Sequence, residues 1–251
     1  MGKNHFIERF RRFLVLRIPA PLAVWLRSVF GQRQEIELKC LKILVKPGDR
    51  VLDIGANRGT YTYPLSKLVG IHGKVIAFEP LPDYYKYLKN AFENKKNVEV
   101  HNLALSDQAG ETVLYLPFLA QLEMPGYATL ENITGQFKEL MIKTQILDNM
   151  EFKDIDFIKI DIEGHEYNFL LGALETLKNS WPILQIELNS QLNSLKVKKT
   201  IQLLTQILEY SVFKFDGKSL ISVDISGFSH SHVESKNLAG ENYIFIRFPE
   251  K

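Results

Sequence analysis

The chain has 251 residues, of which 45% are hydrophobic and 24% charged, enough apolar material for one large domain or two small ones. The net charge of +2 argues against a dedicated nucleic-acid binder, so we expect no nucleic-acid partner. Its one cysteine, Cys40, excludes an intrachain disulfide and suits a reducing, cytoplasmic compartment.

The first 34 residues are strongly basic. They hold seven basic residues and one acidic residue, a charge of +6, which leaves −4 for the rest of the chain. Phe6, Phe10, Phe13 and Leu14 recur at helical spacing between arginines, which predicts a basic amphipathic helical segment. This segment could make the protein peripheral to a membrane, or it could pack on the domain or mediate homo-oligomer formation. The sequence leaves these alternatives open.

Residues 35–251 show short apolar strands alternating with helices, which is typical of βαβ units and a parallel sheet. A final antiparallel strand pair is predicted near the C-terminus, after one more helix. The expected strands span residues 50–54, 74–78, 97–101, 157–161, 183–187, 212–215 and 243–248. The expected helices span residues 60–69, 82–94, 166–178 and 195–209.

An insertion of about residues 111–156 interrupts this alternation. It contains a predicted strand at 112–116, followed by Pro117, Pro125 and Gly126. Insertions of this length in α/β enzymes form either substrate lids or plain surface elaborations, and the sequence favours neither.

The turn from Asp53 to Gly59 is the first candidate site. Gly55 and Gly59 flank a strand-to-helix junction, where glycine permits a positive φ and the close approach of a ligand. The helix N-terminus that follows suits a carboxylate, and Asp53 can bind an ammonium group. The turn therefore matches both charges of an amino-acid moiety, although any α/β protein can contain such a turn.

Glu79 ends the next strand, roughly 20 residues after the glycines, where an acidic side chain can accept hydrogen bonds from ribose hydroxyls. The same position would serve a nicotinamide dinucleotide. However, Asn57 stands where the dinucleotide fingerprint has its middle glycine. An asparagine there would crowd a pyrophosphate but can hydrogen-bond a carboxylate, which favours S-adenosylmethionine (SAM).

The segment Lys159-Ile160-Asp161-Ile162-Glu163-Gly164-His165-Glu166 places several ionisable groups at the end of a buried strand. Sites of α/β proteins form at this edge of the sheet, and clustered ionisable groups shift one another's pKa values. The alternative is a strand end followed by a helix whose first turn favours acidic residues. Asp161 is the strongest functional candidate in this segment.

Four motifs in order resemble the FkbM family of SAM-dependent methyltransferases over about residues 47–190. They are Asp53-Ile-Gly-Ala-Asn-Arg-Gly59, Phe78-Glu-Pro80, Ala104-Leu-Ser-Asp107 with Gly110, and Ile158-Lys-Ile-Asp-Ile-Glu-Gly-His-Glu166. The resemblance implies a class I, Rossmann-like fold: a mostly parallel seven-stranded sheet with helices on both faces and an antiparallel C-terminal pair. It also implies O-methylation of a sugar, glycan or related natural-product hydroxyl.

The resemblance also assigns cofactor-binding residues. The methionine part of SAM would lie on Asp53, Gly55, Asn57 and Gly59, the ribose on Glu79, the adenine beside Ala104 and Leu105, and the sulfonium near Asp161. Further cofactor-binding candidates of the same turn are Ala56, Tyr61 and Thr62.

Removing the proton of an acceptor hydroxyl requires a general base, and the candidate catalytic residues are Asp161, His165 and Glu187. A lone histidine is equally often a structural hydrogen-bonding residue. The carboxylates could also hold a divalent cation such as Mg²⁺. The rival functions are a nicotinamide-dependent oxidoreductase and a non-catalytic SAM-binding or membrane-associated module.

Overall fold

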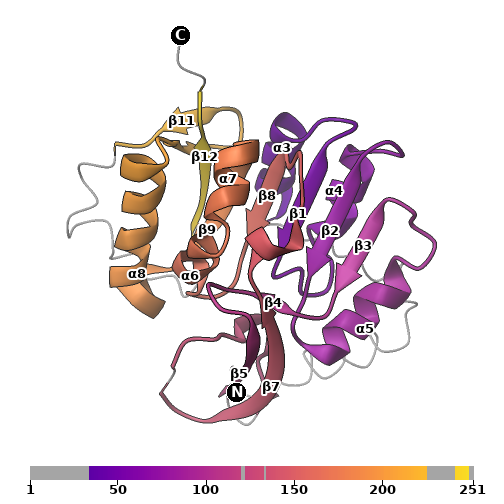
Figure 1. Ribbon diagram of the computed structural model, residues 1–251, viewed down its shortest axis with the longest axis vertical. Coiled ribbons are helices and arrows are strands. Elements are labelled where there is room, and N and C mark those ends of the chain that lie inside the picture. The colour runs from indigo at the N-terminus through magenta and orange to yellow at the C-terminus, as the bar shows by residue number, and fades with distance from the viewer. Residues whose placement is uncertain (1–33, 120–121, 133, 225–240, 249–251) are drawn as a thin grey trace, which may run out of the picture.

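The structure is a computed structural model, and it describes residues 34–119, 122–132, 134–224 and 241–248. These residues form an α/β domain around one large sheet (Figure 1). The predicted basic amphipathic segment 1–34 lies outside the described residues, apart from its last residue. Among the described helices, none combines the length and the apolar character needed to cross a bilayer.

The large sheet contains eight strands in the described part of the chain, one more than predicted. Their order across the sheet is β11 (Leu220–Ser222), β10 (Ser211–Phe215), β12 (Glu241–Ile246), β9 (Ile183–Leu188), β8 (Phe157–Ile160), β1 (Arg50–Ile54), β2 (Lys74–Phe78) and β3 (Val98–His101). The five strands from β9 to β3 are parallel, and β12 pairs antiparallel with both β9 and β10. The predicted mostly parallel sheet with an antiparallel C-terminal pair is confirmed, and the extra strand is the short edge strand β11.

Helices cover both faces of this sheet (Figure 1), and alternate residues of each strand point to opposite faces. On one face, Leu52 and Ile158 pack against α6 (Glu166–Leu171), α7 (Leu174–Ser180) and α8 (Ser190–Gln202). On the other face, Val51 and Phe157 pack against α3 (Gln34–Leu44) and α4 (Thr62–Leu68). Because both faces are covered, every residue of β8 is buried.

Helix α5 (Pro82–Ala91) begins at the predicted proline and packs on Ala77 of β2 through Leu88 and the following Phe92. Gly59 lies under this helix. A Cβ atom at Gly59 would come within 2.9 Å of Leu88 and 3.0 Å of Phe92. The second glycine of the turn is therefore required by helix packing.

The helix expected at 166–178 is two helices, α6 and α7, separated by Gly172 and Ala173. At Gly172 the chain passes against the segment that follows β4 (Ala104–Leu105). A Cβ atom at Gly172 would lie 2.1 Å from the carbonyl oxygen of Ser106. The prediction of one continuous helix was wrong because this tertiary contact is not visible in helical periodicity.

The insertion forms a second, smaller sheet. Its strands, in the order β4, β7 (Phe137–Gln145), β5 (Gly110–Leu119) and β6 (Leu122–Glu123), are dominated by the antiparallel β5–β7 pair. Between β3 and β8 the described chain contains only 3₁₀ turns and these strands, with no α-helix. Figure 1 shows this pair below the carboxyl ends of the parallel strands, so the insertion extends from the edge at which the site was predicted.

Gly55→Ala tests how closely β1 and β8 approach. The new Cβ atom would lie 1.9 Å from the carbonyl oxygen of Asp161, at a φ of +80°. We expect a loss of more than about 3 kcal/mol of unfolding free energy, measured by urea denaturation, since backbone atoms must separate. Gly217→Ala is the matched control, because its φ is +97° but nothing lies within 4 Å of its Cβ position. Equal losses in the two variants would contradict the tight strand junction.

Candidate active site

A hollow of about 750 Å³, counting the part open to solvent, lies at the carboxyl edge of the parallel strands. One wall carries Gly55, Asn57 and Glu79 from the turns after β1 and β2, and another carries Asp161 and His165 from the turn after β8. Apolar residues fill the remaining walls, among them Phe78, Leu103, Leu105, Leu114 and Leu130.

Glu79 holds the first turn in shape. Its carboxylate accepts a hydrogen bond from the backbone N–H of Asn57 at 2.7 Å and another from Leu81 at 2.8 Å. Asn57 adopts a left-handed conformation with a φ of +52°, which asparagine tolerates better than most residues. Burial raises the pKa of Glu79 to about 7, although the two backbone hydrogen bonds oppose the shift.

Asp53, the first residue of the turn, is buried. Thr62, in the first turn of α4, donates a hydrogen bond from Oγ1 to Asp53 Oδ2 at 2.5 Å. In the sheet, Asp53 stands directly opposite Lys159 of β8, whose side chain is fully buried. Burial raises the pKa of Asp53 to about 6, against the opposing effects of Thr62 and Lys159. Asp53 does not line the hollow.

The buried ammonium of Lys159 also has an acidic and an aromatic neighbour. Its Nζ lies 3.6 Å from Asp161 Oδ2 and 4.8 Å from the ring centre of Tyr61. A buried charge needs such partners, because removing an ion from water costs several kcal/mol. Lys159 therefore links the acidic groups at the ends of β1 and β8.

Acidic side chains are concentrated after β8 and at the end of β9. Asp161, Glu163 and Glu187 line the hollow, and Glu166 is buried beside it. Burial, together with repulsion from Asp161, Glu187 and Glu166, raises the pKa of Glu163 to about 9. Burial likewise raises the pKa of Glu166 to about 7, although its carboxylate accepts a hydrogen bond from the N–H of Gly164. At neutral pH, Glu163 therefore keeps its proton and can donate a hydrogen bond.

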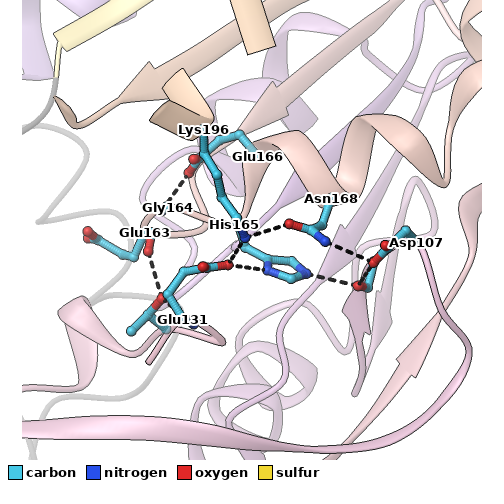
Figure 2. Close-up of polar contacts among 10 residues, drawn as sticks. Asp107, Glu131, Glu163, Gly164, His165, Glu166, Asn168 and Lys196 are labelled. Carbon is cyan, nitrogen blue, oxygen red and sulfur yellow. Dashed lines mark hydrogen bonds and ion pairs between the residues drawn. The ribbon is translucent and has the colours of Figure 1, made fainter. Parts of the chain in front are cut away.

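Both ring nitrogens of His165 are occupied (Figure 2). Its Nδ1 lies 2.8 Å from Glu131 Oε1, and its Nε2 lies 2.8 Å from the hydroxyl of Ser106. Lys196 of α8 donates to the same Glu131 oxygen at 2.5 Å. His165 lines the hollow, but its two nitrogens are directed to protein groups.

The insertion supplies one side of the hollow through Pro125, Gly126, Ala128 and Leu130. Thr129 fixes this stretch in two ways. Its hydroxyl donates to the carbonyl of Glu163 at 2.7 Å, and its backbone pairs with Tyr115 of β5 in both directions. The insertion thus forms part of the wall of the site, as a lid would.

The structure brings together at this hollow eight of the residues predicted from the sequence: Gly55, Asn57, Glu79, Ala104, Leu105, Asp161, His165 and Glu187. The other five candidates do not line it: Asp53, Ala56, Gly59, Tyr61 and Thr62. The assignment of Asp53 to an ammonium group stays a prediction.

Sequence reasoning missed Glu131 and Lys196. Glu131 lies in an irregular part of the insertion and Lys196 in the middle of a helix, so neither follows a strand of the parallel sheet. Ser106 belongs to the predicted motif at Ala104–Asp107, but the motif did not indicate that its hydroxyl meets His165.

The predicted divalent cation finds no support here. Within the ranges that the structure describes, no group of three or more His, Cys, Asp or Glu side chains is arranged to hold a metal ion. Three of the carboxyl groups at the site, those of Glu79, Glu163 and Glu166, have pKa values that desolvation raises to about 7 or above.

Comparison with known proteins agrees with this architecture. The model of the methyltransferase FkbM domain matches residues 53–215, more than half of the chain. No curated protein matches the chain. A solved structure of a methyltransferase FkbM from Methylobacillus flagellatus KT is similar, with a TM-score of 0.51 and 15% identity. The match covers 93% of this chain and 57% of that one, so the chain spans little more than half of that relative's length.

A second similar structure is an O-methyltransferase from Bacillus cereus, solved in complex with SAH. It has a TM-score of 0.50 and 13% identity, and the match covers 92% of both chains. The fold is thus that of the class I, SAM-dependent methyltransferases. The chain belongs to the FkbM methyltransferase family, as its four motifs predicted.

Glu163→Gln tests the buried acid cluster through the pH dependence of stability. Unfolded Glu163 releases its proton near pH 4.5 but the folded protein retains it until about pH 9, so folding becomes less favourable as pH rises through this window. Glutamine has no proton to release. In urea unfolding at pH 5 to 8, the variant should gain stability relative to the wild type, by at most about 1.4 kcal/mol per pH unit.

The control for this measurement is Glu111→Gln, which removes an exposed carboxylate from β5 of the insertion. Its stability should differ from that of the wild type by a constant amount across the same pH range. A constant difference for Glu163→Gln as well would contradict the raised pKa.

Proposed function

We propose that the protein transfers a methyl group from SAM to a hydroxyl group of a small molecule or glycan. The observation that carries this proposal is the single hollow in which Gly55, Asn57 and Glu79 face Asp161 and Glu187. The first set suits the donor and the second the acceptor. Sites of open α/β sheets form at this carboxyl edge.

The residues present fit SAM as the donor. Glu79 is buried at the hollow, with its oxygens fixed by the N–H groups of Asn57 and Leu81, and can accept ribose hydroxyls through its remaining lone pairs. Leu105 and Phe78 offer an apolar wall for a flat base. When bound, SAM supplies an electrophilic methyl group on a sulfonium.

The residues around Asp161 would act on the acceptor. As the bond between the acceptor oxygen and the methyl carbon forms and the carbon–sulfur bond breaks, the hydroxyl proton must leave the oxygen. Asp161 and Glu187 line the hollow and are candidates to receive this proton. Protonated Glu163 can donate a hydrogen bond that orients a second acceptor oxygen. Such alignment lowers the barrier of an in-line displacement.

Asp161→Asn tests the catalytic assignment. In assays with labelled SAM and a panel of sugar and natural-product acceptors, we expect kcat to fall by about 10² to 10⁴, the usual contribution of a general base. Glu93→Gln, at an exposed position after α5, is the control and should turn over normally. Unimpaired turnover in Asp161→Asn would contradict the catalytic assignment of Asp161.

Glu79→Gln tests the donor site. Glutamine keeps only one acceptor oxygen, so either one of the two backbone N–H groups or a ribose hydroxyl loses its hydrogen-bond partner. The Kd for SAM should therefore rise about tenfold or more. Isothermal calorimetry measures this, with Glu93→Gln again as the control. Binding of NAD⁺ in place of SAM by the wild type would favour an oxidoreductase. Binding of SAM without methyl transfer to any acceptor would favour a non-catalytic module.

A further inference from the structure

His165 belongs to a closed ring of polar side chains drawn from four parts of the chain (Figure 2). Ser106 and Asp107 follow β4, Glu131 comes from the insertion, His165 and Asn168 from the start of α6, and Lys196 from α8. Every neighbouring pair in the ring is joined by a contact of 2.5–3.1 Å.

Counting protons around the ring identifies the donor of each contact. Ser106 has one proton and gives it to Asp107 Oδ1, at 3.0 Å. The contact between Ser106 Oγ and His165 Nε2 then requires a proton on Nε2. An ionised Glu131 can only accept, so its contact with Nδ1 requires a second proton there. All contacts are satisfied together only when both nitrogens of His165 carry protons.

The charges agree with this count. Burial would raise the pKa values of Glu131 and Asp107, but hydrogen bonds outweigh it and hold both below their usual range. The donors are His165 and Lys196 for Glu131, and Asn168 and Ser106 for Asp107. Two carboxylates then face one lysine, and the ring is neutral only if His165 is a cation.

We propose that Glu131 is a positioning residue that holds His165 as a doubly protonated imidazolium. This imidazolium fixes the insertion to α6 and does not take the proton of the substrate hydroxyl. The part of this inference that concerns catalysis rests on the proposed function and leaves Asp161 and Glu187 as the bases. The ionisable groups nearest the imidazole are Asp107, Glu131 and Lys196, with Glu163 and Glu166 in the same segment of chain and Asp161 and Glu187 also lining the hollow.

The polar ring also holds in place the wall that the insertion contributes to the hollow. Glu131 stands next to Leu130 and two residues from Thr129, which binds the carbonyl of Glu163. The backbone N–H of Glu131 also donates to the Thr129 hydroxyl at 3.0 Å. The ion pair with His165 and Lys196 therefore anchors the wall that the insertion contributes to the hollow.

Nitrogen NMR of the full chain, labelled with ¹⁵N-histidine, tests the proposal without any acceptor. Multiple-bond correlation spectra at pH 7 show whether each ring nitrogen carries a proton, and the spectrum of His165→Gln identifies the resonances of His165 among the six histidines. We expect both nitrogens of His165 to be protonated in the wild type. A neutral ring in the wild type overturns the proposal, whatever any variant does.

Glu131→Gln and Lys196→Met should have opposite effects. Removing the carboxylate should cost His165 one of its two ring protons at pH 7, whereas removing the competing lysine should leave both in place. Glu139→Gln, an exposed residue of β7 in the same insertion, is the matched control and should resemble the wild type. Two protons retained in folded Glu131→Gln would contradict the role of Glu131, as would a proton lost in Lys196→Met.

Kinetics separate positioning from proton transfer. With an acceptor in hand, Glu131→Gln should raise the KM for the acceptor and change kcat by less than about tenfold, below the effect of losing a general base. A large fall in kcat at unchanged KM would assign the His165–Glu131 pair to proton transfer and overturn the inference. If the wild type methylates no acceptor, the proposed function fails while the NMR result still decides the state of His165.

Discussion

At the ends of β1 and β8 the two strands approach so closely that only a residue without a side chain fits. Gly55 meets the carbonyl of Asp161 there, and the N–H of Asp161 donates to the carbonyl of Ile54 at 3.0 Å. This junction sets two distant parts of the chain side by side: the turn that would bind the donor and the acidic segment that would act on the acceptor. Its glycine is required by contact between strands, whether or not a ligand also passes near it.

Behind the junction lies a buried layer of charge. Asp53 and Lys159 face each other across β1 and β8, and Lys159 reaches towards Asp161. Most buried charges are costly, and replacing such a pair by apolar residues often stabilises a protein. Here Lys159 lies 3.6 Å from Asp161, which lines the hollow. The raised pKa values of Glu79, Glu163 and Glu166 follow from the same crowding of acidic groups in a dry environment.

The insertion replaces the helix that a βαβ crossover would place between β3 and β8. Its small sheet extends from the carboxyl edge, and its irregular stretch from Pro125 to Glu131 walls the hollow and joins the polar ring of His165. An element that looks like an interruption in the sequence is therefore part of the site. Within a shared fold, variation in such an element is a means of changing the acceptor while the donor side is preserved.

The sequence by itself determined the parallel strands, the helices between them and the residues at the strand ends, because apolar periodicity and turn chemistry are local properties. It also determined the family, through motifs at Asp53–Gly59 and Ile158–Glu166. Only the tertiary structure decided the break at Gly172, the packing role of Gly59 and the partners of His165. Each of these depends on contacts between residues at least 29 positions apart in the chain, a separation at which neither periodicity nor spacing carries information.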